Sequence, residues 1–165
     1  MMHPTHNEHA ISAAILTVSD TRTEKTDSSG LYIHEALSAA SFSIQAYLIE
    51  KDEPLRLIEH IKKWCQNPSI NTIIVTGGSG FSPRDQSFEA LTPLFEKEMT
   101  GFGELFRSLS YDAIGPKAMF SRATAGCRQQ TAIYLIPGSK NAVTLAMKQL
   151  IIPTVQHFVG ELNRP

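Results

Sequence analysis

A run of small residues is the segment of this chain best suited to bind an anionic ligand. Thr76-Gly-Gly-Ser-Gly80 follows Thr72–Val75, whose β-branched residues predict a strand in a buried parallel sheet. Small residues let the backbone turn tightly and approach a ligand, and the amides of such a turn can bind an anion. A turn needed only to reverse the chain would use the same residues. Its place at the carboxyl end of a strand favours a ligand.

The spacing within this run argues against three other glycine-rich motifs. A Walker A loop would need a lysine between the glycines and Asp85, and none is present. The dinucleotide-binding pattern would need a third glycine where Pro83 stands, and a nucleophile elbow would need one where Phe81 stands. An esterase that combined Ser79 with His157 therefore loses its main support.

Two aspartates are expected near this loop. Asp85 follows it where a helix is predicted to begin, and Asp52 follows a second predicted strand. A structural role would also explain each of them: Asp85 could cap the helix, and Asp52 could lie in a solvated acidic turn. Two carboxylates beside a bound phosphate would repel it by ~4 kcal/mol per close charge pair at an effective dielectric constant of about 20. Mg²⁺ held between carboxylates and phosphates removes that repulsion, so the pair predicts Mg²⁺-dependent phosphoryl or nucleotidyl chemistry.

Three further loops are expected on the same side of the molecule. Ser19-Asp20 ends the first predicted strand, and Pro137-Gly-Ser-Lys-Asn141 forms another strand-to-helix turn. Ser121 and Arg122 offer a hydroxyl and a guanidinium to a phosphate, although Arg122 is equally well explained as a structural ion-pair partner. Each loop is a weak signal alone, and only their convergence indicates a site.

The segments that must position these loops alternate between strands and helices. This order predicts an α/β fold, a three-layer α/β/α arrangement with a mostly parallel sheet, in which ligands bind beyond the carboxyl ends of the strands. Strands are predicted at Ala13–Val18, Ser43–Ile49, Thr72–Val75 and Ala132–Ile136, and helices near Leu31–Ser38, Pro54–Cys65, Gln86–Lys97, Phe102–Leu109 and Ala142–Leu150.

Periodicity also predicts which side chains face the core. Ile44, Ala46 and Leu48 are expected on one face of the second strand, and Leu55 on the apolar side of the second helix. Ser28-Ser29 offers a side-chain cap for the first helix.

Composition limits the classes of function. The chain has 165 residues, 42% of them hydrophobic, which is typical of one globular domain, predicted at residues 11–165 after a flexible tail of residues 1–10. The net charge of −1 gives no reason to expect nucleic-acid binding. No apolar run reaches the ~20 residues of a membrane helix, and the amino terminus lacks a signal-peptide core, so a cytoplasmic protein with two reduced cysteines is expected.

Taken together, the motifs resemble the MoaB/MogA family of molybdenum cofactor biosynthesis proteins. The resemblance spans about Ile11 to Leu150, with the motifs in family order. They are Leu16-Thr-Val-Ser-Asp20, Asp27-x-Ser-Gly30, Thr76-Gly-Gly-Ser-Gly80, Arg84-Asp85, Phe102-Gly-Glu104, Ser121-Arg122-Ala123 and Pro137-Gly138-Ser139.

This resemblance implies a molybdopterin-binding domain that assembles as a trimer or hexamer and works beside other molybdenum-cofactor enzymes. MogA-type members adenylylate molybdopterin with Mg-ATP and release pyrophosphate. The family's catalytic and Mg²⁺-binding aspartates fall on Asp52 and Asp85. The implied molybdopterin- and nucleotide-binding positions are Ser19, Asp20, Thr76, Gly77, Gly78, Ser79, Gly80, Ser121, Pro137, Gly138, Ser139, Lys140 and Asn141.

Three departures from the usual family pattern bear on the reaction. Ser79 replaces a threonine and keeps its hydroxyl, and Lys140 replaces a proline and adds a cation. Gln86-Ser87 replaces Val-Thr, which is more similar to the MoaB branch. The alternatives to an adenylyltransferase are a non-catalytic molybdopterin carrier or scaffold and, less favoured, an unrelated nucleotide-binding hydrolase of similar fold.

Overall fold

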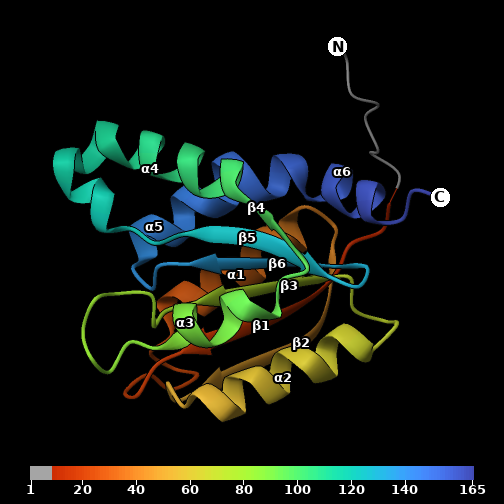
Figure 1. The fold of residues 1–165 in the computed structure, drawn as a ribbon, viewed down its shortest axis with the longest axis horizontal. Coiled ribbons are helices and arrows are strands. Elements are labelled where there is room, and N and C mark those ends of the chain that lie inside the picture. Colours follow the sequence, from red (N-terminus) through yellow and green to blue (C-terminus); the bar gives the residue numbers. More distant parts are fainter. Residues whose placement is uncertain (1–8) are drawn as a thin grey trace.

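A mixed six-stranded sheet forms the centre of the molecule, with strand order β2-β1-β3-β6-β5-β4 (Figure 1). The computed structural model describes residues 9–165. Strands β2, β1, β3 and β6 pair in parallel, and β5 is antiparallel to both of its neighbours, so the predicted mostly parallel sheet is confirmed. The strands are β1 Ser12–Val18, β2 Ser43–Glu50, β3 Thr72–Thr76, β4 Lys97–Met99, β5 Thr124–Arg128 and β6 Thr131–Ile136.

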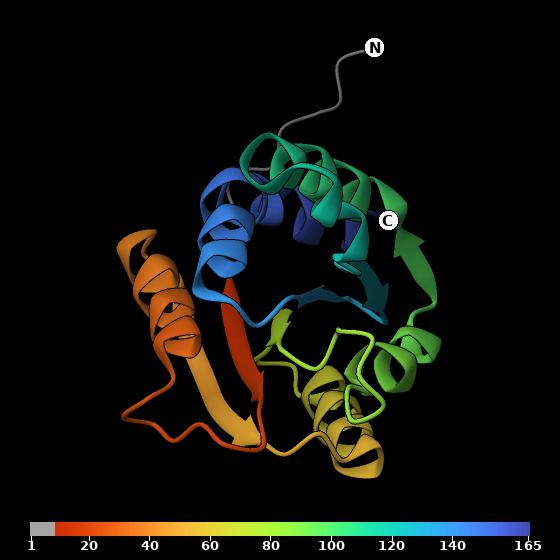
Figure 2. The ribbon, with the colours of Figure 1, turned by 90° about the vertical axis from the view of Figure 1, so that its left-hand side faces the viewer.

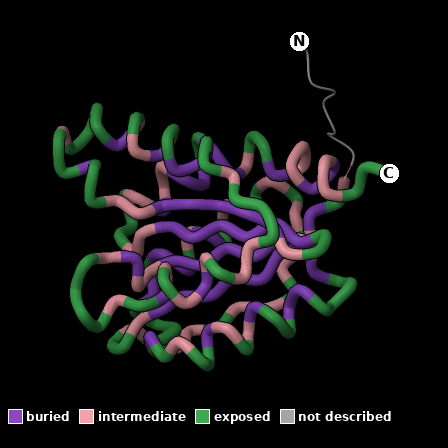
Figure 3. Tube along the Cα trace, in the orientation of Figure 1, coloured by how far each residue is buried: buried purple, intermediate pink, exposed green. Residues whose placement is uncertain are grey.

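Helices cover both faces of this sheet, as the three-layer prediction requires. One core cluster joins the sheet to α1, α4, α5 and α6, and the other joins it to α2 and α3. Figure 3 shows the central strands buried between helices whose outer faces are exposed. The helical segments are α1 Ser28–Ala39, α2 Pro54–Gln66, α3 Ser87–Leu91, η1 Thr92–Leu94, α4 Thr100–Ile114, η2 Gly115–Phe120, α5 Lys140–Leu145, η3 Ala146–Ile151 and α6 Ile152–Leu162.

Successive side chains of the parallel strands enter opposite cores. In β3, Ile74 packs toward α1 and α4–α6, whereas Ile73 and Val75 pack toward α2 and α3. Full burial of an aliphatic side chain of this size contributes ~1.5–3 kcal/mol. Both faces of the strand are thus apolar, which is why a run of β-branched residues correctly predicted a central strand.

The predicted face of β2 holds for Ala46 and Leu48 but is wrong for Ile44, because the strand contains a bulge. Its register against β1 shifts between Ile44 and Ala46, so that Gln45 is the extra residue. Ile44 therefore packs against one core cluster and Ala46 against the other, and Leu48 is 39% exposed. Strict alternation of side chains cannot hold across an inserted residue.

The helix predicted at Gln86–Lys97 is also wrong over most of its length. Helix α3 ends at Leu91, a short 3-10 turn follows, and the chain then enters β4. Pro93 accounts for the stop, because it has no amide to donate to the preceding turn. Strands β4 and β5 were not predicted, since neither Lys97–Met99 nor the small residues of Thr124–Arg128 show a strand pattern.

The last helical region is longer than predicted. The helix expected to end near Leu150 continues as a π-helical turn, η3, into α6. Pro153 lies in the first turn of α6, and the wider turn before it accommodates the missing amide. The residues of α6 thus add Val155 and Val159 to the core, which the sequence pattern did not predict.

Two smaller predictions need correction. Asp27, and not Ser28 or Ser29, caps α1, because its Oδ1 accepts from the Gly30 amide at 2.9 Å. Leu55 in α2 is 83% exposed, and Leu57 takes the buried position expected for it.

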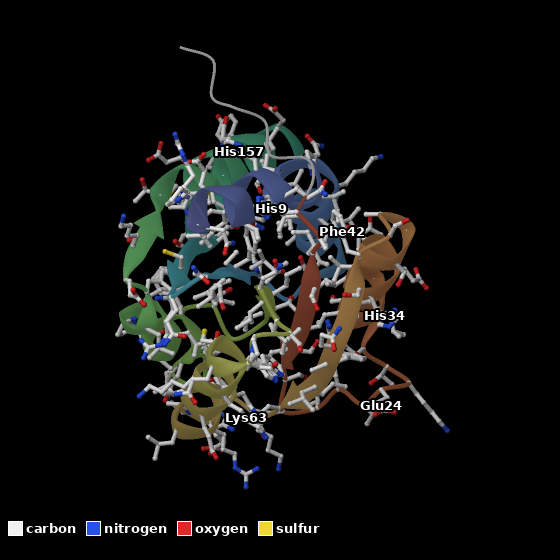
Figure 4. All side chains as sticks on the ribbon, turned by 90° about the vertical axis from the view of Figure 1, so that its right-hand side faces the viewer. His9, Glu24, His34, Phe42, Lys63 and His157 are labelled. Carbon is white, nitrogen blue, oxygen red and sulfur yellow. The ribbon has the colours of Figure 1, made fainter. Side chains whose placement is uncertain are left out.

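The loops at the carboxyl ends of the parallel strands gather at one end of the molecule, which Figure 2 views directly. Figure 4 shows the opposite end, where the carbonyl of His9 accepts from the Gln156 side chain of α6 at 3.1 Å. The predicted flexible tail, residues 1–10, lies outside the described residues apart from His9 and Ala10. Within the described chain, every helix is too short or too polar to cross a membrane.

Candidate functional site

A hollow of about 410 Å³ lies where the loops after β1, β3 and β6 meet η2. Most of its wall is backbone or small side chains, so a ligand would contact peptide groups directly. Its lining residues are Thr17, Val18, Ser19, Arg22, Thr76, Gly77, Gly78, Ser79, Gly80, Asp85, Phe120, Ser121, Pro137 and Gly138.

Glycine is required at two positions of the loop after β3. Gly77 and Gly78 have φ angles of 98° and 69°, in the left-handed region that side chains rarely adopt. A Cβ atom on Gly77 would lie 2.3 Å from the Val18 carbonyl oxygen, and one on Gly78 would lie 2.5 Å from Asp52 Oδ2. The double glycine therefore lets the loop turn while it is packed against β1 and Asp52.

The first two carbonyls of this turn are held by one serine of α3. Ser87 donates its hydroxyl to the Gly77 carbonyl at 2.7 Å and its backbone amide to the Gly78 carbonyl at 3.1 Å. Ser87 itself is buried. The carbonyl oxygens of Gly77 and Gly78 thus point toward α3.

The next two carbonyls are held by Arg122. Its Nε donates to the Ser79 carbonyl at 2.8 Å and its Nη2 donates to the Gly80 carbonyl at 2.7 Å. In a trans peptide the carbonyl and the following amide point in opposite directions. The amides of Gly78, Ser79, Gly80 and Phe81 are therefore turned away from Ser87 and Arg122. No described residue accepts a hydrogen bond from these four amides, which we call the amide nest. Successive free amides in a turn can bind an anion.

Asp52 lies beneath the nest. It is only 4% exposed. Its Oδ2 accepts from the Gln86 amide at 2.9 Å, and this hydrogen bond caps the start of α3. Its Oδ1 is buried with no hydrogen-bond partner among residues 9–165. Burial raises the pKa of Asp52, the Gln86 amide opposes this, and the negative charge of Asp85 raises the pKa further.

Asp85 lines the hollow itself. A Cβ atom on Gly80 would lie 2.7 Å from its Oδ2, just as one on Gly78 would lie 2.5 Å from Asp52 Oδ2. The two carboxylates therefore flank the same short stretch of loop, and their charges interact. The sequence analysis predicted that the two acids lie close together, and both lie beside the glycine loop.

The donor set fits a hard divalent cation. A buried carboxylate oxygen without a partner, beside a second carboxylate, suits Mg²⁺ or a similar ion. Among the described residues, no group of three or more His, Cys, Asp or Glu side chains could hold a metal. An ion held by Asp52 and Asp85 would take its other ligands from water and a bound phosphate, which is the usual arrangement for Mg²⁺.

Besides Asp52, four of the predicted binding residues lie outside this lining. Asp20 pairs with Arg84 at 2.7 and 2.9 Å, and this hydrogen bonding lowers the pKa of Asp20 to about 2. Ser139 caps α5 by accepting from the Ala142 amide at 3.2 Å. Ser139 and Asn141 line a neighbouring depression, and Lys140 is exposed outside the hollow.

Four residues of the lining were not predicted: Thr17 and Val18 at the end of β1, Arg22 and Phe120. Arg22 is the only basic side chain among the described residues that line the hollow, and its Nη1 lies 3.4 Å from Oδ1 of the buried Asp27. Phe120 is 61% exposed and meets Phe81 edge to face at 6.0 Å between ring centroids. The proximity of Arg22 to Asp20 in sequence was the available signal for it, whereas Phe120 carries no pattern that distinguishes it from a core residue.

A larger hollow of about 1150 Å³ adjoins the first one. The two share Ser19 and Arg22 in their linings, and the larger one extends between the loop after β1, the end of β2 and the start of α2. The loop after β1 therefore lies between two spaces, and Arg22 lines both of them.

Comparison with known proteins agrees with this architecture. The family described as "Probable molybdopterin binding domain" matches residues 14–157. Molybdenum cofactor biosynthesis protein B of Bacillus subtilis (strain 168) is 47% identical over 151 residues, which is 91% of this chain and 89% of that protein.

Solved structures give the same result. A crystal structure of a molybdenum cofactor biosynthesis protein B has a TM-score of 0.91 at 39% identity, covering 95% of this chain and 98% of that one. The tungsten cofactor synthesizing protein MoaB from Pyrococcus furiosus has a TM-score of 0.84 at 31% identity, covering 94% and 98%. The predicted resemblance is thus confirmed: the chain belongs to the MoaB/MogA family of molybdenum cofactor biosynthesis proteins, which share a molybdopterin-binding domain.

Proposed function

We propose that this protein binds molybdopterin and adenylylates it with Mg-ATP. An oxygen of the molybdopterin phosphate attacks the α-phosphorus of ATP, a new P–O bond forms, and the bond to the bridging oxygen breaks as pyrophosphate leaves. The observation that carries the proposal is the nest of four free amides beside two interacting carboxylates. Amides favour the bound phosphates, and the carboxylates supply the ligands for the cation that such chemistry uses.

The residues around the nest have distinct roles in this proposal. The amides of Gly78 to Phe81 bind a phosphate, and Arg22 adds a guanidinium between the two hollows. Arg22 can thus reach phosphates from a ligand in either space. The hydroxyls of Ser19 and Ser121 line the same wall, and the exposed ring of Phe120 offers a surface for a flat heterocycle.

The neighbouring depression extends the site. It shares Ser121 and Pro137 with the hollow and is lined further by Ser139 and Asn141. A ligand longer than the hollow would extend into this depression. We propose that the turn after β6 contacts the part of the ligand that lies there.

Asp52 and Asp85 would hold Mg²⁺, which would neutralise phosphate charge and polarise the reacting phosphoryl group. Asp52 also keeps the start of α3 in place through the Gln86 amide. Its substitution therefore disturbs the loop as well as the cation site, and Asp85 is the cleaner residue to change.

The test is to incubate purified protein with molybdopterin, ATP and MgCl₂ and to measure pyrophosphate and adenylylated product. Asp85→Asn is expected to lower the rate by about 10²-fold or more, the size of effect seen when a group that stabilises transition-state charge is lost. Glu35→Gln, at an exposed position of α1 outside the linings of both hollows, is the control and should leave the rate unchanged.

Absence of product from the wild-type protein would sink the enzyme proposal. If molybdopterin still bound, the protein would be a carrier or scaffold in the same pathway. Nucleotide hydrolysis without molybdopterin would instead indicate an unrelated phosphohydrolase reaction.

We also propose that the protein assembles into a trimer or hexamer. Helix α4 and η2 expose large apolar side chains, a pattern typical of surfaces that pair with another chain. Light scattering should give a mass of three or six chains, and Ile114→Glu should lower it. A monomeric wild-type protein would contradict this. The exposed apolar residues of these elements are Leu105, Tyr111, Ile114, Met119 and Phe120.

A further inference from the structure

We propose that Arg122 is a positioning residue that holds the amide nest open, and that it does not bind substrate itself. The inference rests on the proposed function, because it concerns how the same loop binds a phosphate. The sequence left two roles open for Arg122, a phosphate ligand or an ion-pair partner. The contacts of its side chain include such an ion pair, with Glu89, and assign it a further role in holding the loop.

The guanidinium of Arg122 is committed to protein groups on every side. Besides the Ser79 and Gly80 carbonyls, it forms a two-point ion pair with Glu89 of α3. These contacts use four of the five N–H groups that an arginine carries. Arg122 is absent from the lining of the hollow.

Two aromatic rings fix the plane of this guanidinium. Its central carbon lies 4.8 Å from the ring centroid of Phe81 and 4.7 Å from that of Phe88. The side chain is only 19% exposed. Stacking of a cation on aromatic rings is favourable and is stronger when water is excluded. The rings thus orient the guanidinium toward the two loop carbonyls.

The consequence for the nest comes from peptide geometry. The Ser79 and Gly80 carbonyls point at Arg122, so the amides of Gly80 and Phe81 must point away from it. Without Arg122 these two peptides could rotate, because glycine tolerates many backbone conformations. A rotated peptide would present a carbonyl oxygen to the hollow and repel the phosphate that the amide would bind.

Arginine is specifically suited to this task. Its planar fork donates from two nitrogens in fixed directions while its face stacks on a ring. Lysine would keep the positive charge but donates from a single atom, so it cannot span both carbonyls and both rings in the same geometry. The proposal therefore predicts a large difference between two residues of equal charge.

The experiment compares Arg122→Lys and Glu89→Gln with the wild type by calorimetric titration of Mg-ATP and of molybdopterin. We expect Arg122→Lys to weaken binding of at least one of them by about tenfold or more. Glu89→Gln removes the ion pair and keeps both loop contacts, so it should change affinity less than about twofold. Unchanged affinity in Arg122→Lys would overturn the proposal, as would an equal loss in Glu89→Gln.

A chemical rescue distinguishes positioning from general stability. Arg122→Ala leaves a gap between two rings into which methylguanidinium fits. Low concentrations of methylguanidinium should restore binding in this variant and leave the wild type unaffected. Failure to rescue a folded Arg122→Ala protein would contradict the proposal.

Amide signals provide a measurement that needs no variant. In isotope-labelled wild-type protein, the amide resonances of Gly80 and Phe81 should shift on addition of Mg-ATP or molybdopterin. If neither ligand moves them while binding occurs elsewhere, the positioning role is wrong. If the ligands bind at the nest but no product forms, only the adenylyltransferase proposal fails.

Discussion

Two loops of this protein occupy equivalent places but present their backbone differently. The glycine loop follows β3 and the proline loop, residues 137–141, follows β6, its parallel neighbour in the sheet. In both, side chains hold consecutive carbonyls. In the proline loop, Thr76 Oγ1 donates to the Pro137 carbonyl at 2.9 Å and Ser29 Oγ donates to the Gly138 carbonyl at 2.8 Å.

The loops differ beyond these anchored carbonyls. The proline loop enters α5 at once, and Ser139 satisfies the Ala142 amide. The glycine loop continues for several residues before α3, with its next carbonyls held by Arg122 and its own amides left without partners. We propose the phosphate site at the glycine loop because four consecutive carbonyls, from Gly77 to Gly80, are held there by other groups of the protein, whereas two are held in the proline loop.

The kind of anchor also differs. Hydroxyl groups on β3 and α1 hold the proline loop, whereas a guanidinium from a distant segment holds part of the glycine loop. Net contributions are ~0.5–1.5 kcal/mol for a neutral hydrogen bond and ~1.5–3 kcal/mol when one partner is charged. The glycine loop should therefore respond more strongly to single substitutions.

The sharpest comparison is Gly78→Ala against Gly138→Ala. Gly78 has φ 69° and no room for a Cβ atom, whereas at Gly138 the nearest atom would lie 3.2 Å away and no positive φ is involved. Strain and overpacking should cost Gly78→Ala about 2–4 kcal/mol of unfolding free energy and abolish Mg-ATP binding. Gly138→Ala should cost about 1 kcal/mol. Denaturant unfolding and calorimetry measure both, and equal effects would remove the distinction between the loops.

A second prediction concerns Asp27, which caps α1 and so positions Ser29 behind the proline loop. Burial would raise the pKa of Asp27, but hydrogen bonds from Tyr47 and the Gly30 amide outweigh it, and the pKa lies below its ordinary value. A lowered pKa contributes stability that is fully present above the unfolded-state pKa of about 3.9. That contribution is lost as the pH falls toward the folded-state pKa.

Asp27→Asn should therefore lower the unfolding free energy by about 2 kcal/mol at pH 7, and by the same amount at pH 5. The difference from wild type should shrink below about pH 4. Urea unfolding at several pH values measures it. A difference that grew on acidification would show that the sign assigned to Asp27 is wrong.

These two loops also show how far the sequence could predict the site. The glycine loop was recognisable because small residues directly after a β-branched strand free the backbone to turn tightly. The groups that hold its carbonyls could not be predicted, because Arg122 is about forty residues away and its contacts exist only in the folded chain. Local pattern likewise missed the bulge at Gln45 and the strand Thr124–Arg128, because pairing with neighbouring strands creates both.

The hydroxyl anchors allow a finer comparison, Ser87→Ala against Ser29→Ala. Each removes one neutral hydrogen bond to a loop carbonyl, at a cost of about 1 kcal/mol. Only Ser87→Ala frees a carbonyl of the nest, so it should weaken Mg-ATP binding about threefold, equivalent to ~0.6 kcal/mol, while Ser29→Ala should not. Ser87→Thr keeps the hydroxyl and serves as the control. Equal binding losses in the two alanine variants would mean that both loops contact the nucleotide.

The smallest effect is expected for Lys140→Ala in the proline loop. Lys140 is exposed and outside the hollow, so its stability effect should stay within about 0.5 kcal/mol, as for most surface positions. At about 0.15 M salt its charge is screened beyond ~8 Å, and Mg-ATP affinity should change less than about twofold. The family resemblance instead placed Lys140 among the binding residues. A tenfold loss of affinity would support that placement and would show that the proline loop reaches the ligand as closely as the glycine loop does.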